Sequence, residues 1–237
     1  MKNNSSDPNH MIHVDNNLEL IKIKDQVICC RSCPRLISYI EQIGKTKVKR
    51  FITDEYHAKP LPGFGDSNAR LFVLGLAPAA HGGNRTGRIF TGDSSGDWLV
   101  KAMFETGFAN KPYSLNKNDG LELIGAYMTA AVKCAPPQNK PNSNEISNCS
   151  HHLLSELLAL KDTTTVILTL GKIAFDAYCK LFQLEKLAFV HGACYSLDDQ
   201  KSLLVSYHPS RRNTSTGKLT WGMWINIFEK ARSLIVN

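Results

Sequence analysis

Short apolar runs alternate with longer mixed segments along most of the chain, and this alternation restricts the fold more than any other feature. The runs that we expect to be strands span residues 70–76, 126–132, 164–170 and 202–207. Each is short and largely apolar, as is typical of a strand buried on both faces. A loop and a helical segment follow each run, and this order favours a parallel sheet with helices on both faces. We therefore expect an α/β protein, with a three-layer α/β/α fold and a central, mostly parallel sheet.

The same pattern indicates one main domain. The helices that we expect span residues 18–27, 30–43, 97–106, 144–160, 173–182 and 220–234. No internal repeat or low-complexity linker divides the chain, and its 237 residues suit one large α/β domain. We predict a single domain over residues 25–237, preceded by a flexible N-terminal tail over residues 1–24.

The charge balance indicates the class of partner. The net charge of +7 favours an acidic partner such as nucleic acid. No apolar stretch reaches the roughly 18 residues that a membrane-spanning helix needs. Residues 1–17 are polar and lack the apolar run of a secretory signal. We therefore expect a cytoplasmic, monomeric protein with no membrane partner.

Four of the seven cysteines are spaced like metal ligands: Cys30, Cys33, Cys134 and Cys149. Disulfides rarely persist in a reducing cytoplasm, so these cysteines are core residues, catalytic groups or ligands. The first two lie among charged and polar residues, and the third lies where a strand gives way to a polar loop. Such placement disfavours a purely apolar role and predicts a metal centre.

Spacing alone leaves the identity of this centre open. Zinc and a four-iron cluster both accept four sulfur ligands, and we favour the cluster. Cys29 is an alternative to Cys30 as a ligand. The remaining two cysteines, Cys179 and Cys194, are interpreted as structural.

The loop after the first predicted strand is the most informative segment. Residues 75–93 read GLAPAAHGGNRTGRIFTGD and contain five glycines, which allow a backbone to approach a ligand closely. Arg85 and Arg88 could contact phosphates, and Phe90 offers a flat face for stacking on a base. Asp93 is the only carboxylate in the segment.

This loop resembles the first motif of the uracil-DNA glycosylase superfamily, and it is most similar to the type 5 (B-type) branch. Further segments match the same branch in chain order: CxxCPRL at residues 30–36, GFGD at 63–66, VKCAPPQNKP at 132–141 and YHPS at 207–210. The resemblance implies a three-layer α/β/α fold and hydrolysis of the N-glycosidic bond of uracil and other deaminated bases in DNA, as in base excision repair. It also implies a [4Fe-4S] cluster, whose ligands would be Cys30, Cys33, Cys134 and Cys149.

The resemblance assigns roles to further residues. The residues implied to be catalytic are Asp93, Asn139 and His208. Those implied to form the base pocket are Gly75, Ala77, His81, Phe90 and Ala130. Those expected to contact the DNA backbone are Arg85, Arg88, Ser210, Arg211 and Arg212.

The chemistry of base release suits these residue types. The target base must leave the duplex and enter a pocket. Breaking the bond builds positive charge on the sugar and negative charge on the base, which a carboxylate and hydrogen-bond donors stabilise. In narrower uracil-specific relatives an Asn aligns with Ala130, so the small residue predicts a broader choice of base.

Three other functions are compatible with parts of the sequence. A non-enzymatic DNA-binding module, with a metal held by four cysteines, explains the charge and the cysteines, but not the glycine-rich loop with Phe90 and Asp93. The segment Gly92–Gly96 matches the Gly-x-Ser-x-Gly pattern of serine hydrolases, although that motif needs a strand running directly into the serine turn. An electron-transfer protein would also use a metal–sulfur centre.

Overall fold

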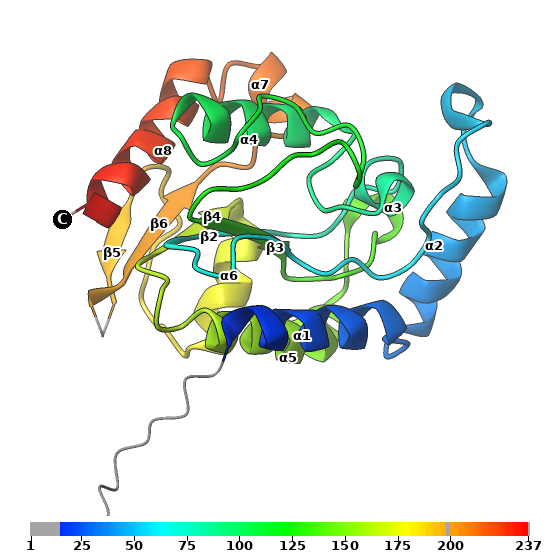
Figure 1. Ribbon diagram of the computed structural model, residues 1–237, viewed down its shortest axis with the longest axis horizontal. Helices are drawn as coiled ribbons and strands as arrows, with labels where there is room; N and C mark the ends of the chain where they lie inside the picture. The colour runs from blue at the N-terminus through cyan, green and yellow to red at the C-terminus, as the bar shows by residue number, and fades with distance from the viewer. Residues whose placement is uncertain (1–14, 198–199, 237) are drawn as a thin grey trace, which may run out of the picture.

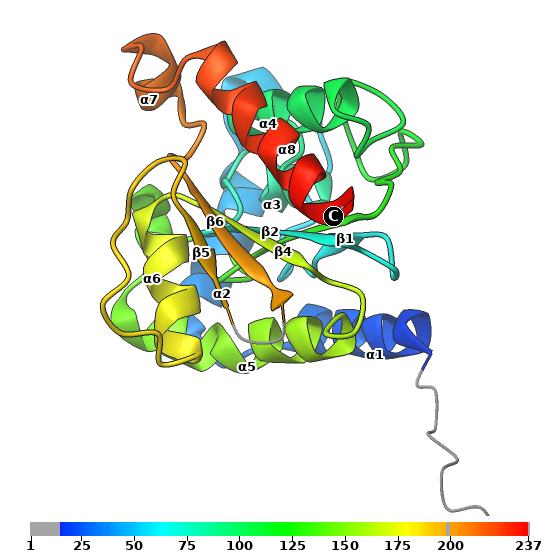
Figure 2. The same cartoon turned by 90° about the vertical axis from the view of Figure 1, so that its left-hand side faces the viewer.

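The computed structural model describes residues 15–197 and 200–236, which form a six-stranded sheet covered by helices on both faces (Figures 1 and 2). The strands lie in the order β1-β3-β2-β4-β6-β5. Their bounds are Phe64–Gly65 for β1, Leu71–Gly75 for β2, Ala126–Ala130 for β3, Val166–Leu170 for β4, Cys194–Ser196 for β5 and Ser202–Ser206 for β6. The four central strands are parallel, and the two short edge strands are antiparallel to their neighbours.

The main helices form the two outer layers. Their bounds are Asn16–Cys29 for α1, Pro34–Thr46 for α2, Ser94–Glu105 for α4, Ser143–Ala159 for α5, Lys172–Leu181 for α6 and Trp221–Val236 for α8. Short helices are α3 (Gly83–Thr86), α7 (Arg211–Ser215) and the 3-10 turns η1 (Lys49–Phe51) and η2 (Pro137–Asn139). Helices α4 and α8 cover one face of the sheet, while α1, α5 and α6 lie on the other (Figure 1). The three-layer prediction is confirmed.

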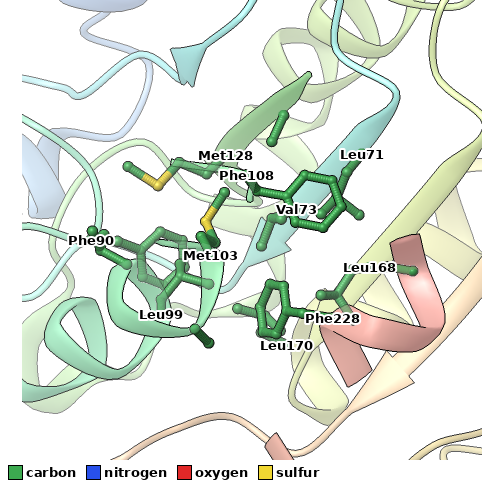
Figure 3. Close-up of a cluster of buried hydrophobic side chains, with 14 of the residues drawn as sticks. Leu71, Val73, Phe90, Leu99, Met103, Phe108, Met128, Leu168, Leu170 and Phe228 are labelled. Atoms are coloured by element: carbon green, nitrogen blue, oxygen red, sulfur yellow. The ribbon is translucent and has the colours of Figure 1, made fainter. Parts of the chain in front are cut away.

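Alternate side chains of each central strand enter different cores. From β2, Leu71 and Val73 pack under α4 and α8 (Figure 3), whereas Phe72 and Leu74 pack toward α5 and α6. All residues of β2 are buried, because helices cover both sides of the strand. This two-sided burial explains why the strands are recognisable as continuous apolar runs.

The helix expected over residues 18–27 is present as α1, which begins two residues earlier. Helix α1 starts at Asn16, capped by the carboxylate of Asp15, and buries Ile23 and Val27. The predicted tail boundary at residue 24 therefore falls inside a helix and is wrong for residues 16–24. Residues 1–14 of the predicted tail lie outside the described residues.

The carboxyl ends of the parallel strands share one edge of the sheet, where ligand sites of such folds form. Gly75, the last residue of β2, lies in register with Ala130, the last residue of β3. The loops that leave this edge hold residues 76–93, 131–142, 171 and 207–210. Among the described helices, none is long and apolar enough to cross a membrane.

Candidate active site and cysteine pocket

Asp93 is the N-cap of α4 at this edge of the sheet. Its Oδ1 accepts hydrogen bonds from the backbone amides of Ser95 and Gly96, at 2.9 and 3.0 Å. A Cβ at position 82 would overlap the Oδ2 atom, so only a glycine fits beside this carboxylate. Burial raises the pKa of Asp93, and the two amides partly oppose that effect. Within the described residues Oδ2 has no hydrogen-bond partner, which leaves it available to a ligand.

Phe90 lies against the end of β2 in a conformation that few residues adopt. Its φ is 51°, in the left-handed region, and its side chain is 7% exposed. A Cβ at Gly75 would collide with the Phe90 ring, and one at Gly96 would collide with the Phe90 carbonyl. These two glycines allow the loop to fold back over the sheet edge. The structure thereby brings Phe90, Gly75 and the neighbouring Ala130 together.

His208 follows β6 and packs on Gly171, the residue after β4. A Cβ at Gly171 would lie 3.1 Å from that of His208. Burial lowers the pKa of His208 to about 4, so its ring is neutral at physiological pH. Its carbonyl accepts a hydrogen bond from the side-chain amide of Asn213 at 2.9 Å, which fixes α7 to the site. A neutral imidazole can donate a hydrogen bond to a base without carrying charge into the pocket.

Asn139 lies in the loop after β3 and is exposed. Its φ is 56°, and the preceding Gln138 has a φ of 54°. Two consecutive left-handed residues that are not glycine carry backbone strain of order 1–3 kcal/mol each. Such strain often accompanies a functional loop, which is consistent with the expected role of Asn139.

The other two predicted pocket residues, His81 and Ala77, have different surroundings. His81 Nδ1 lies 3.0 Å from the Tyr56 hydroxyl. Burial and the charge of Arg85 lower the pKa of His81. Ala77 packs against the small apolar cluster that includes Cys134.

The two arginines of the loop stabilise the protein instead of facing solvent. The Arg88 side chain is only 4% exposed and pairs with Asp119 at 2.7 Å. Its predicted phosphate contact is therefore wrong, because the guanidinium is enclosed and neutralised. Arg85 pairs with Asp54 at 2.7 Å and is 14% exposed, so it too is unsuited to a phosphate contact. Both carboxylates lie 31 residues away in sequence, and nothing in the loop itself indicates them.

The residues predicted to contact DNA after β6 are differently placed. Ser210 caps α7 by accepting a hydrogen bond from the backbone amide of Asn213 at 3.4 Å. Arg211 and Arg212 lie on α7 and are exposed. They remain available to an anionic partner at the same edge as His208.

Four cysteines from four parts of the chain line one pocket. Cys30 ends α1, Cys33 precedes α2, Cys134 follows β3, and Cys149 lies on α5. The cavity between them is small, about 10 Å³. Cys29 is exposed and does not line it, which favours Cys30 as the candidate ligand.

Four thiols are a suitable ligand set for either zinc or a four-iron cluster. Cys134 and Cys149 are each 8% exposed, and the Lys133 amide donates to the Cys149 sulfur at 3.2 Å. Among the described residues, no three His, Cys, Asp or Glu side chains converge closely enough to hold one metal ion.

A buried ionic network beneath the site was not predicted. Lys133 pairs with Glu156 at 2.6 Å, and their side chains are 1% and 0% exposed. Glu156 also accepts from the hydroxyl of Thr129 at 2.8 Å and from the amide of Gly63 at 3.0 Å. The network thus joins β3, α5 and the segment before β1. Only the position of Lys133 at the end of an apolar run could have suggested it.

Comparison with known proteins identifies the family. The model of the uracil DNA glycosylase superfamily matches residues 62–232. The chain belongs to this superfamily. Its glycine-rich loop, the Asp93 cap and His208 all lie within the segment that matches the superfamily model.

Several similar members of the superfamily are named type-5 enzymes, and others are named type-4. The Type-5 uracil-DNA glycosylase of Thermus thermophilus is 47% identical over 86% of this chain and 93% of its own length. The protein of that name from Pyrobaculum aerophilum is 45% identical, covering 83% of this chain and 84% of its own length. A Type-4 uracil-DNA glycosylase from the latter organism is 30% identical over 66% of this chain. The resemblance to the type 5 branch is confirmed.

Membership of the uracil-DNA glycosylase superfamily leaves little support for the other functions. In the structure Ser94 begins α4 directly after the Asp93 cap, and the preceding residues 87–92 form no strand. The serine-hydrolase arrangement is therefore absent from this described segment. The alternative function, a non-enzymatic module that binds a metal and DNA, does not explain why glycines pack so closely around Asp93.

Proposed function

We propose that this chain is a uracil-DNA glycosylase of the type 5 branch, acting on DNA in base excision repair. The observation that carries this proposal is the Asp93 carboxylate, fixed at the start of α4 and covered by Gly82 inside the loop that matches the family. His208, whose ring is kept neutral by burial, follows β6 at the same edge of the sheet. A monomeric state and a cytoplasmic location stay predictions.

The residues suit the two charges that form as the glycosidic bond breaks. After the nucleotide leaves the duplex, Asp93 would stabilise the positive sugar and orient the attacking water. Neutral His208 would donate to the leaving base, and Asn139 would assist from the opposite loop. Phe90 would pack against the base plane. Release of uracil from oligonucleotides that each carry one modified base, detected by alkaline strand cleavage, tests the activity; a lack of abasic sites would refute it.

The choice of base is proposed to be broad because Ala130 presents only a methyl group at the pocket. A site that hydrogen-bonds its substrate rejects analogues strongly, because a wrong base leaves buried polar groups unpaired. Wild-type protein should release hypoxanthine or xanthine as well as uracil, and Ala130→Asn should favour uracil. Single-turnover rates on matched duplexes measure this, with Ala131→Ser as a neighbouring control. Release of uracil alone by the wild type would contradict the proposal.

We also propose a [4Fe-4S] cluster held by Cys30, Cys33, Cys134 and Cys149, whose role would be mainly structural. Protein purified without oxygen should be brown and contain about four iron atoms per chain, as this cluster type requires. Cys134→Ser should lose iron and lower the melting temperature, whereas Cys179→Ser, outside the pocket, should keep both. Colourless protein with one zinc per chain and full stability would refute the cluster.

A further inference from the structure

A basic segment that the active site does not use follows α2. We call residues 45–52 the basic wing; its sequence is KTKVKRFI. The wing holds four cations, and no carboxylate occurs between residues 45 and 53. It projects beyond α3 in Figure 1, as the light-blue end of α2 and the turn that follows it.

Two of these four cations interact with the helix end or the turn itself. Lys45 lies in the last turn of α2, where a positive charge complements the helix dipole. The Lys47 ammonium donates to the Ile52 carbonyl at 3.3 Å and closes the turn. Lys49 and Arg50 are exposed and form no ion pair within the described part of the chain. Their charges are therefore free to meet an anion.

An aromatic stack holds the wing in place. The guanidinium carbons of Arg50 and Arg85 lie 4.4 and 3.8 Å from the ring centroid of Phe51. Asp54 neutralises Arg85 but not Arg50. Cation–π contacts of this kind restrict a long side chain before any ligand arrives. The wing thus presents a partly ordered, uncompensated guanidinium.

The same stack joins the wing to the active-site loop. Arg85 donates to the His81 carbonyl at 2.8 Å and to the Gly92 carbonyl at 3.4 Å, one residue before Asp93. Figure 1 shows the wing and α7 on the same side of the molecule, apart from one another, with α1 and α5 along the opposite side. A ligand lying along the side that holds the wing and α7 could contact both.

We propose that the basic wing is a second contact for the DNA backbone, in which Lys49 and Arg50 pair with phosphates on the side of the extruded nucleotide opposite α7. The inference rests on the proposed glycosylase function. A DNA strand fits better than an acidic protein, because the wing is fixed to the loop that would receive the nucleotide. Arg85 thereby acts as a positioning residue for the wing, not as a phosphate ligand.

The salt dependence of binding tests this contact. Each lost phosphate contact lowers the slope of log affinity against log salt by about 0.9. The double variant Lys49→Ala/Arg50→Ala should lower the slope by about 1.8 on that basis and weaken binding to undamaged duplex. The control Lys24→Ala/Lys161→Ala removes the same amount of charge from exposed sites on α1 and after α5. It should change neither the salt slope nor the affinity for undamaged duplex. A wing variant that behaves like this control would overturn the proposal.

Duplex length gives an independent measurement. Removing the base pairs on the side of the lesion that the wing would contact should weaken binding by the wild-type protein as much as the double substitution does. The same shortening should not weaken binding by the wing variant any further. Equal sensitivity of both proteins to trimming on either side would overturn the wing assignment. Failure of the proposed function is distinguishable, because it would abolish uracil release by the wild type while leaving the salt slopes measurable. At saturating protein the wing variant should keep the wild-type rate of base release.

Discussion

Asp93→Asn is expected to slow base release by about a hundredfold or more, as is typical when a group that stabilises transition-state charge is removed. Asparagine is as good an N-cap as aspartate, so its side-chain oxygen can still accept from the Ser95 and Gly96 amides. The fold, the melting temperature and the affinity for DNA should therefore be unchanged. The measurement is the single-turnover rate of uracil release with protein in excess.

Asp97→Asn is the matched control, because Asp97 lies in the first turn of the same helix but is exposed. It should keep the wild-type rate. Burial raises the pKa of Asp93, so this carboxylate takes up a proton at a higher pH than an ordinary aspartate does. As the solution is acidified, the rate of base release should therefore begin to fall at that higher pH. Full activity of Asp93→Asn would move the role to another group, with Asn139 the next candidate.

Lys133→Met is expected to lower the free energy of unfolding by about 3–5 kcal/mol, because it leaves the Glu156 carboxylate buried without its counter-charge. The ammonium lies 2.6 Å from that carboxylate, and neither side chain is accessible. The double variant Lys133→Met/Glu156→Leu should recover much of the loss, since both charges are then replaced by apolar groups. Urea denaturation of preparations with equal metal content measures the effect.

An exposed ion pair provides the comparison. Lys172 and Asp176 lie one turn apart on α6 at 2.8 Å, and both side chains are largely exposed. Lys172→Met should cost about 0–1 kcal/mol, as exposed pairs do. If Lys133→Met were as mild, solvent would have to reach the buried network, contrary to the packing around it.

Local sequence patterns predicted the central strands and the main helices. Features that depend on contacts between residues distant in sequence could not be predicted in this way. The central strands were recognisable because helices bury both of their faces, as for residues 71–75. The edge strands β1 and β5 span two and three residues, too short to form a pattern. The cysteine set was evident from spacing and setting, and the structure gathers it into one pocket.

Arg88 shows most clearly what the sequence alone could not predict. A polar, glycine-rich segment with Arg88 is typical of an anion-binding loop, yet the structure encloses this side chain with Asp119. The Lys133–Glu156 pair was equally hidden, because its partner lies 23 residues away on α5. Whether a charge faces solvent or a buried counter-charge depends on tertiary packing, which residue order alone does not reveal.

The pocket lined by Cys30, Cys33, Cys134 and Cys149 also restricts when the protein can finish folding during synthesis. The first two thiols leave the ribosome more than a hundred residues before Cys149 does, and the surface of α5 on which α1 packs emerges equally late. Until then α1 lacks α5, the helix on which it packs, and Cys30 lacks its neighbour Cys149 in the pocket. Closing so long a loop carries an entropic penalty that short-range contacts do not repay. Helix α1 can therefore reach its final position only after α5 has been synthesised.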